Sequence, residues 1–118
     1  MVESSVHKAK VQGLRDSSRE WVGREDVKIW NFGRTGGLKP GYGSNTGTIG
    51  PELGFGTVVG EAFDEPVLLI RIAWGGKSIG KDFRPPSAGG EVGPEYRILV
   101  DRTKEVLQDA GRQFPELA

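Results

Sequence analysis

Residues 66–76 read PVLLIRIAWGG, and this stretch decides the fold class that we expect for the chain. Its apolar side chains run almost continuously from Val67 to Trp74, with Arg71 as the one charged residue. Continuous hydrophobicity over this length predicts a strand covered on both faces, as in a parallel sheet, because a strand with one wet face would alternate instead. A proline before the run and a glycine pair after it set its ends.

A helix is predicted immediately before this strand, over residues 51–63. GPEL at residues 50–53 favours a helix start, because proline lacks only an N–H that has no intrahelical partner there and Glu52 suits the positive end of the helix dipole. The expected apolar face repeats at helical spacing: Leu53, Phe55, Val58, Val59, Ala62 and Phe63. Three glycines in this helix weaken it by roughly 1 kcal/mol each relative to alanine, and we expect them to permit close packing against a sheet.

The elements around this pair complete an α/β pattern. Upstream, residues 27–32 predict a short half-buried strand, and residues 33–50 predict one long glycine-rich loop. Downstream, residues 75–93 predict a second long loop, followed by an amphipathic helix over residues 94–110 with Gly111 as its stop. The stripe expected on that helix is Tyr96, Leu99, Val100, Thr103, Val106, Leu107 and Ala110. Helix, break, buried strand and loop indicate an α/β fold with a short parallel sheet.

The chain is expected to divide into a weakly structured segment, residues 1–25, and a partial domain, residues 26–118. Within the first segment, residues 6–14 favour a short helix. No apolar stretch of signal-peptide type occurs at the N-terminus, and no apolar run is long enough to cross a bilayer. These observations leave the compartment open.

Composition excludes several classes of function. Lys+Arg and Asp+Glu both number 16 and are interspersed, so the basic surface of a nucleic-acid binder is not expected. Without cysteine there is no disulfide scaffold, and with a single histidine no metal site is expected. Glycine is the anomaly: 19 of 118 residues, or about 16%, against a typical usage of about 7%. So much loop leaves a modest core, and the chain is expected to be marginally stable unless it self-associates.

Residues 76–80, GKSIG, fit the G-x-S-x-G pattern of a nucleophile elbow after a strand. The pattern also requires a direct turn into a helix, and the sequence KDFRPP that follows is a poor helix start. The only histidine, His7, lies in a polar segment and is interpreted as a solvated side chain rather than a base. We therefore interpret Ser78 as a loop residue whose hydroxyl caps backbone or contacts a ligand. The same residues fail as a phosphate-binding loop, because Arg71 stands where the first glycine is required.

The three tryptophans could form a surface for sugar rings, since aromatic faces pack on apolar ring faces. For Trp30, core packing is favoured. Trp74 ends the predicted strand beside the glycine loop, where α/β sheets place their ligands, so both interpretations stay open for it.

Four segments taken together resemble the sialate O-acetylesterase and acetylxylan esterase group, carbohydrate esterase family 6. They are IGPELGFG at residues 49–56, PVLLI at 66–70, AWGGKS at 73–78 and FRPPS at 83–87. The resemblance covers residues 26–111 best. It implies an SGNH hydrolase, a three-layer α/β/α fold with a flavodoxin-like parallel sheet, of which this chain would be a part. It also implies deacetylation of acetylated carbohydrates without a cofactor, in a family whose members are often exported.

The resemblance carries few catalytic residues onto this sequence. The family's serine in a Gly-Gln-Ser-Asn motif would lie upstream, and its Gly-x-Asn-Asp or Gln-Gly-Glu-Ser-type segment and its Asp-x-x-His pair would lie downstream. The family places an oxyanion-hole glycine N–H at the position of Gly50. The loop after the strand would line the substrate pocket, with Trp74, Gly75, Gly76, Lys77, Ser78 and Arg84 as candidate substrate-binding residues.

Three functions follow from these observations. The first is a fragment of a carbohydrate O-acetylesterase, inactive alone, which pairs with the missing parts of the domain or with itself. The second is a non-catalytic carbohydrate-binding or structural module derived from that domain. The third, an active esterase that uses Ser78, is disfavoured because no base is in prospect.

Overall fold

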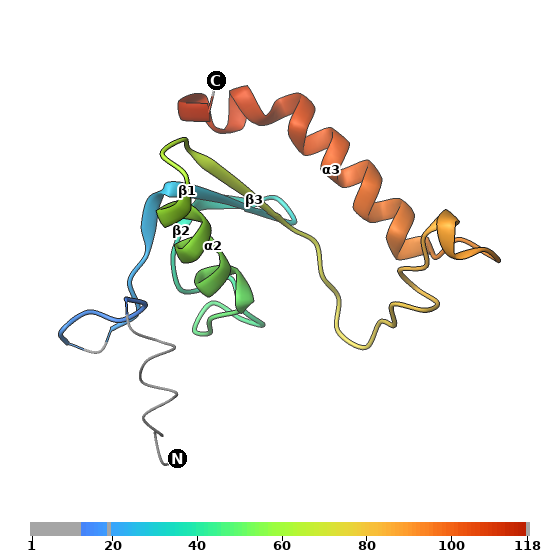
Figure 1. The fold of residues 1–118 in the computed structure, drawn as a ribbon, viewed down its shortest axis with the longest axis horizontal. Helices are drawn as coiled ribbons and strands as arrows, with labels where there is room; N and C mark the ends of the chain where they lie inside the picture. Colours follow the sequence, from blue (N-terminus) through green and yellow to red (C-terminus); the bar gives the residue numbers. More distant parts are fainter. Residues whose placement is uncertain (1–12, 19, 118) are drawn as a thin grey trace, which may run out of the picture. The chain divides into compact units, whose positions relative to one another are not determined.

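The computed structural model describes residues 13–18 and 20–117 (Figure 1). The chain divides into two compact units, Met1–Leu69 and Ile70–Ala118, and the boundary falls within a strand. Most of the short helix expected over residues 6–14 lies outside the described residues.

A three-stranded sheet forms the framework of the first unit. Strand β1 (Arg24–Asn31) lies in the middle, with β2 (Arg34–Leu38) on one side and β3 (Val67–Arg71) on the other. The antiparallel pair β1–β2 is joined by a two-residue turn, Phe32 and Gly33, in which both residues have positive φ angles, as a type I′ hairpin requires. The sheet is therefore mixed rather than parallel.

Strand β2 corrects the prediction of one loop over residues 33–50. The sequence RTGGL shows no apolar alternation, so nothing in its pattern marks a strand. The tight turn forms this strand by bringing it back along β1, where Ile29 lies opposite Gly36 and Trp30 opposite Thr35. The expectation of a loop holds only for residues 39–50.

Strand β3 also differs from its prediction. It ends at Arg71 rather than Trp74, and all five of its residues are half-buried instead of fully buried. Helix α2 (Pro51–Ala62) covers one face of the sheet (Figure 1), and the core between them consists of Val27, Ile29, Leu38, Tyr42 and Leu53. A small α/β fold is confirmed, whereas the two-sided burial expected of a three-layer parallel sheet is not found at β3.

Helix α2 packs on the sheet through glycine, as its sequence predicted. A Cβ atom at Gly56 would lie 2.4 Å from a Leu38 methyl carbon and 2.9 Å from one of Leu69, and a Cβ at Gly60 would lie 2.7 Å from Val27. Such distances leave no room for a side chain. The helix axis therefore approaches the sheet more closely than larger residues would allow.

The expected apolar face of α2 is only partly buried. Leu53 is 1% exposed, but Phe55, Val58 and Phe63 are 62%, 69% and 58% exposed. The face toward the sheet carries the two glycines instead, because close backbone contact took precedence over burial of the larger side chains. An aromatic and aliphatic flank of the helix is left in solvent.

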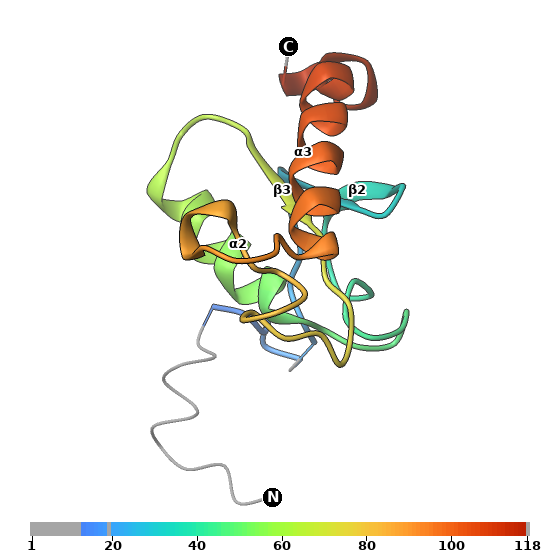
Figure 2. The ribbon, with the colours of Figure 1, turned by 90° about the vertical axis from the view of Figure 1, so that its right-hand side faces the viewer.

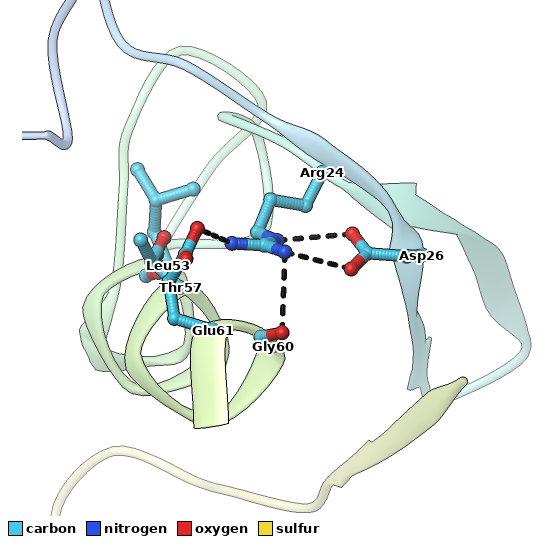
Figure 3. A network of polar contacts seen from close by, with 6 residues as sticks. All are labelled: Arg24, Asp26, Leu53, Thr57, Gly60 and Glu61. Carbon is cyan, nitrogen blue, oxygen red and sulfur yellow. Dashed lines mark hydrogen bonds and ion pairs between the residues drawn. The ribbon is translucent and has the colours of Figure 1, made fainter. Parts of the chain in front are cut away.

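Arg24 joins the end of α2 to the start of β1 (Figure 3). Its guanidinium binds both carboxylate oxygens of Asp26, at 2.9 and 2.7 Å, and also donates to the carboxylate of Glu61 and to the Gly60 carbonyl oxygen. The hydrogen bonds from Arg24 lower the pKa of Asp26 below its usual value. Because the Gly60 carbonyl belongs to the last turn of α2, the arginine also contacts the negative end of the helix dipole.

The second unit consists of the loop over residues 75–93 and helix α3 (Pro94–Gln113), with short 3₁₀ turns at Pro86–Ala88 and Pro115–Leu117. Figures 1 and 2 show α3 as one continuous helix. Gly111 was predicted to stop it and does not. The helix ends at Gln113, because Pro115 has no N–H and restricts Phe114 to a non-helical conformation.

Burial along α3 is uneven within the predicted stripe. Val106 is 3% exposed, while Leu107 is 60% exposed.

Trp30 of β1, predicted as a core residue, is 8% exposed, so that prediction is confirmed. None of the described helices combines the length and the hydropathy needed to cross a membrane.

Candidate functional site

Gly50, the candidate oxyanion-hole residue, is the N-cap of α2. Its N–H donates to Oε1 of Glu52 at 3.0 Å, and Glu52 is 7% exposed. The glutamate thus supplies the cap that glycine lacks, in the manner of a capping box but one residue earlier. The N–H does hold a negatively charged oxygen, and any substrate oxyanion would have to replace this carboxylate.

Ser78 is a turn residue of the loop over residues 75–93. Its hydroxyl oxygen accepts the N–H of Lys81 at 3.1 Å, and its own N–H donates to the Asp82 carboxylate at 2.8 Å. This second bond is the main reason why the pKa of Asp82 is lowered. No helix begins at Ser78, so the geometry of a nucleophile elbow is not formed, and the interpretation that its hydroxyl caps backbone agrees with these bonds.

Lys77 joins the loop to the first turn of α3. Its Nζ lies 2.6 Å from Oε1 of Glu95 and 3.9 Å from the carboxylate of Asp82. The Glu95 side chain is 10% exposed, and its carboxylate raises the pKa of Lys77. The other Glu95 oxygen, Oε2, is buried and has no hydrogen-bond partner among the described residues. Lys77 is thus engaged by carboxylates, while its side chain stays 37% exposed.

Arg84 closes the loop on itself. Its guanidinium donates to three backbone carbonyl oxygens, those of Gly80, Ala88 and Gly89. A guanidinium has five N–H donors, so part of its capacity is still available for a ligand. These bonds tie residue 80 to residues 88–89 within the loop.

A cavity of about 450 Å³ lies against this loop, within the second unit. Its charged lining residues are Lys81, Asp82, Arg84 and Glu91, and the rest of the lining comes from Gly80, Gly90 and residues 92–94. Two cations and two carboxylates around one cavity suit an uncharged, hydroxyl-rich ligand better than an ion of either sign. The volume falls within the range typical of small-molecule sites.

Trp74 is half-buried and packs against Phe83, with ring centroids 5.9 Å apart. Gly75 and Gly76 are exposed, and Gly76 has a φ angle of 73°, which a glycine adopts at little cost. Trp74 thus precedes the loop that carries Lys77 and Arg84, and among the six candidate substrate-binding residues only Arg84 lines the cavity. Gly50 belongs to the other unit.

Two residues of this region were missed as site residues, Asp82 and Glu95. Their contact with Lys77 is the feature that organises the loop. The sequence did contain a signal for Glu95. The motif Gly-Pro-Glu occurs at residues 50–52 and again at residues 93–95, and the glutamate is buried in both places. The spacing from Lys77 to Glu95 gives no such signal, because no helical or strand period joins them.

No group of three or more metal-ligating side chains occurs among the residues that the structure describes. Comparisons with protein-family models, with curated proteins and with solved structures find no match to this chain. The class that fold and site define is therefore a small α/β protein with a polar, glycine-rich loop against a cavity.

Proposed function

We propose that this chain is an internal part of a carbohydrate O-acetylesterase of the sialate O-acetylesterase type and is inactive in ester hydrolysis by itself. The observation that carries the proposal is the start of α2, where the Gly50 N–H binds a carboxylate oxygen at 3.0 Å. An oxyanion hole needs a backbone donor that holds a negative oxygen at this distance, at a helix N-terminus. The carboxylate of Glu52 occupies that place in the isolated chain.

The loop over residues 75–93 supports a carbohydrate as the substrate class. Its cavity is lined by balanced charges, and Trp74, which precedes the loop, packs against Phe83 of the loop. Hydroxyl groups both donate and accept hydrogen bonds, so a wall with lysine, arginine and carboxylates suits a sugar. Ser78 does not act as the nucleophile in this proposal, because its hydroxyl oxygen accepts a backbone N–H and no helix begins at this residue.

The observed sheet order differs from the order that the proposal requires in the complete domain. In a flavodoxin-like sheet the order is 2-1-3-4-5, so the first strand lies between the second and the third. If β1 and β3 are the second and third strands, a strand with the nucleophile would have to enter between them. They are neighbours in this chain. Addition of that strand is therefore expected to separate β1 from β3.

The first test is to translate the DNA on both sides of the reading frame. A Gly-Gln-Ser-Asn segment upstream together with an Asp-x-x-His segment downstream is the expected result. Unrelated flanks on both sides would contradict the proposal and favour the second function, a carbohydrate-binding or structural module.

The second test is hydrolysis of a chromogenic acetyl ester by the purified 118-residue chain. The expected rate equals that of buffer, for the natural chain and for Ser78→Ala alike. Turnover that Ser78→Ala abolishes would overturn the proposal, because it would make Ser78 a nucleophile. Ile79→Ala is a suitable control, since this neighbouring side chain is 83% exposed.

A further inference from the structure

A second hollow of about 420 Å³, called the α3 hollow below, lies beside helix α3 within the second unit. Its lining consists of two loop residues and four residues of α3: Pro86, Val92, Tyr96, Arg97, Val100 and Asp101. Val92 also lines the cavity of about 450 Å³, called the loop cavity below, so the two hollows meet at this residue. Neighbouring groups of one ligand can therefore occupy both hollows.

The lining of the α3 hollow combines apolar and charged side chains. Val92, Tyr96 and Val100 are half-buried, whereas Arg97 and Asp101 are exposed. A sugar ring presents C–H groups on its faces and hydroxyl groups around its edge. The half-buried side chains suit the faces of such a ring, because apolar and aromatic groups pack well on C–H groups. The exposed charged groups suit its hydroxyl groups, which both donate and accept hydrogen bonds.

The two charged side chains of the α3 hollow are available to a ligand. Arg97 and Asp101 lie one turn apart on α3 and have opposite charges, a spacing at which helices can form ion pairs. Neither side chain has a hydrogen bond or an ion pair with another described residue. Further along the same helix, Arg102 does pair with Glu105 at 2.7 Å. One cationic donor and one anionic acceptor thus remain beside the apolar lining, and because their charges balance, an uncharged ligand with hydroxyl groups fits best.

We propose that the α3 hollow is a second carbohydrate subsite, which binds the sugar ring next to the one in the loop cavity. This inference rests on the proposed function, which makes a carbohydrate the ligand of the loop cavity. Tyr96 packs on the C–H face of the second ring, and Arg97 and Asp101 bind hydroxyl groups at its edge. Consecutive rings of a carbohydrate chain are joined through a single oxygen atom, which suits two hollows that meet at one residue.

Titration of the purified 118-residue chain with uncharged carbohydrates, followed by the NMR chemical shifts of its backbone amides, tests the proposal. The probes are xylotetraose, cellotetraose, mannotetraose and chitotetraose, each compared with its own monosaccharide. At least one tetrasaccharide is expected to bind at least about tenfold more tightly than its monosaccharide, because a second ring is held as well. The proposal is overturned if no tetrasaccharide binds, or if each binds only as tightly as its monosaccharide.

A double variant assigns the added affinity to the α3 hollow. Arg97→Ala combined with Asp101→Ala should weaken tetrasaccharide binding at least about tenfold, because two hydrogen bonds from charged groups are lost. Both side chains are exposed and have no partner among the described residues, so the fold should be unchanged. Lys104→Ala is the matched control, since Lys104 is exposed on the same helix and does not line the hollow. Equal tetrasaccharide affinity of the double variant and the unchanged chain would overturn the proposal.

Carbohydrate binding and the flanking DNA answer separate questions. Tetrasaccharide binding that depends on Arg97 and Asp101, together with unrelated flanks, would support the subsite and contradict the esterase. Esterase flanks without such binding would support the proposed function and overturn the subsite.

Discussion

Helices α2 and α3 begin with the same three residues, Gly-Pro-Glu, and use them differently. Glu52 folds back to the N–H of its own N-cap, Gly50. Glu95 instead binds the ammonium of Lys77, because the N–H of Gly93 already donates to the Arg84 carbonyl oxygen. The same motif thus forms a cap within one helix and an ion pair with a distant lysine in the other. The difference arises from the residues that precede each helix, because they decide whether the N-cap N–H is already bonded.

The two helices also bury opposite kinds of residue. Toward the sheet, α2 presents Gly56 and Gly60 and leaves Phe55 in solvent. Helix α3 buries Val106 and, in its first turn, Glu95, while its other charged residues are exposed or half-buried. When two glycines lie one turn apart on a helix, as Gly56 and Gly60 do, the apolar stripe does not identify the buried face. Close backbone contact through the glycines then competes with burial of the larger side chains.

The largest expected effect comes from filling the glycine face of α2. Gly56→Leu should destabilise the chain by about 3 kcal/mol or more and leave the first unit unfolded, since its side chain would collide with Leu38 and Leu69. Urea denaturation followed by tryptophan fluorescence measures this. Gly54→Ala is the control, because a Cβ at Gly54 meets no atom closer than 4.0 Å. Equal stability of the two variants would show that α2 does not pack on the sheet through Gly56.

The two Gly-Pro-Glu motifs can be compared directly with matched amides. Glu95→Gln should destabilise by about 1–2 kcal/mol, because the ammonium of Lys77 loses its charged partner at a partly exposed site. Glu52→Gln should cost about 0.3–1 kcal/mol, since the amide oxygen still accepts the Gly50 N–H while the charge at the positive end of the helix dipole is lost. Thermal unfolding of both variants gives the order. A larger destabilisation by Glu52→Gln than by Glu95→Gln would contradict the interpretation of Glu52 as a local cap and of Glu95 as the partner of Lys77.

The last turns of the helices differ in charge, and this predicts a pH dependence for α3. Hydrogen bonds from Arg112 and Gln113 lower the pKa of Asp109 to about 2 from its usual 3.8. Because the folded pKa is the lower one, this stabilisation is present above about pH 4 and is lost as the pH falls toward 2. Circular dichroism at helix wavelengths should show natural chain and Asp109→Asn differing at neutral pH and converging below pH 4. A constant difference across this range would contradict the assignment.

A small effect of the opposite sign is expected at the end of α3. Gly111 is a helical, exposed residue rather than a left-handed cap, so Gly111→Ala should stabilise the chain by about 0.5–1 kcal/mol. The melting temperature measures the change. Destabilisation would mean that Gly111 adopts the conformation of a helix stop after all.

Much of the local structure could be predicted from sequence because its signals are local. Proline after glycine marks the starts of both α2 and α3, and the apolar run after Pro66 marks β3. Strand β2 could not be predicted, since RTGGL acquires its strand character only from the turn that returns it to β1. The candidate loop could be located, but the pairing of Lys77 with Glu95 could not, because it joins residues 18 positions apart across an irregular segment.

By itself, the sequence determined an α/β chain, the starts of its two helices and the glycine-rich loop that follows Trp74 and carries Lys77, Ser78 and Arg84. Only the tertiary structure decided which face of α2 is buried, that the sheet is mixed, and that the Gly50 N–H is bound by Glu52. The reason is physical: helix starts and turns depend on the conformations of neighbouring residues, whereas burial and carboxylate partners depend on which distant atoms arrive at contact distance.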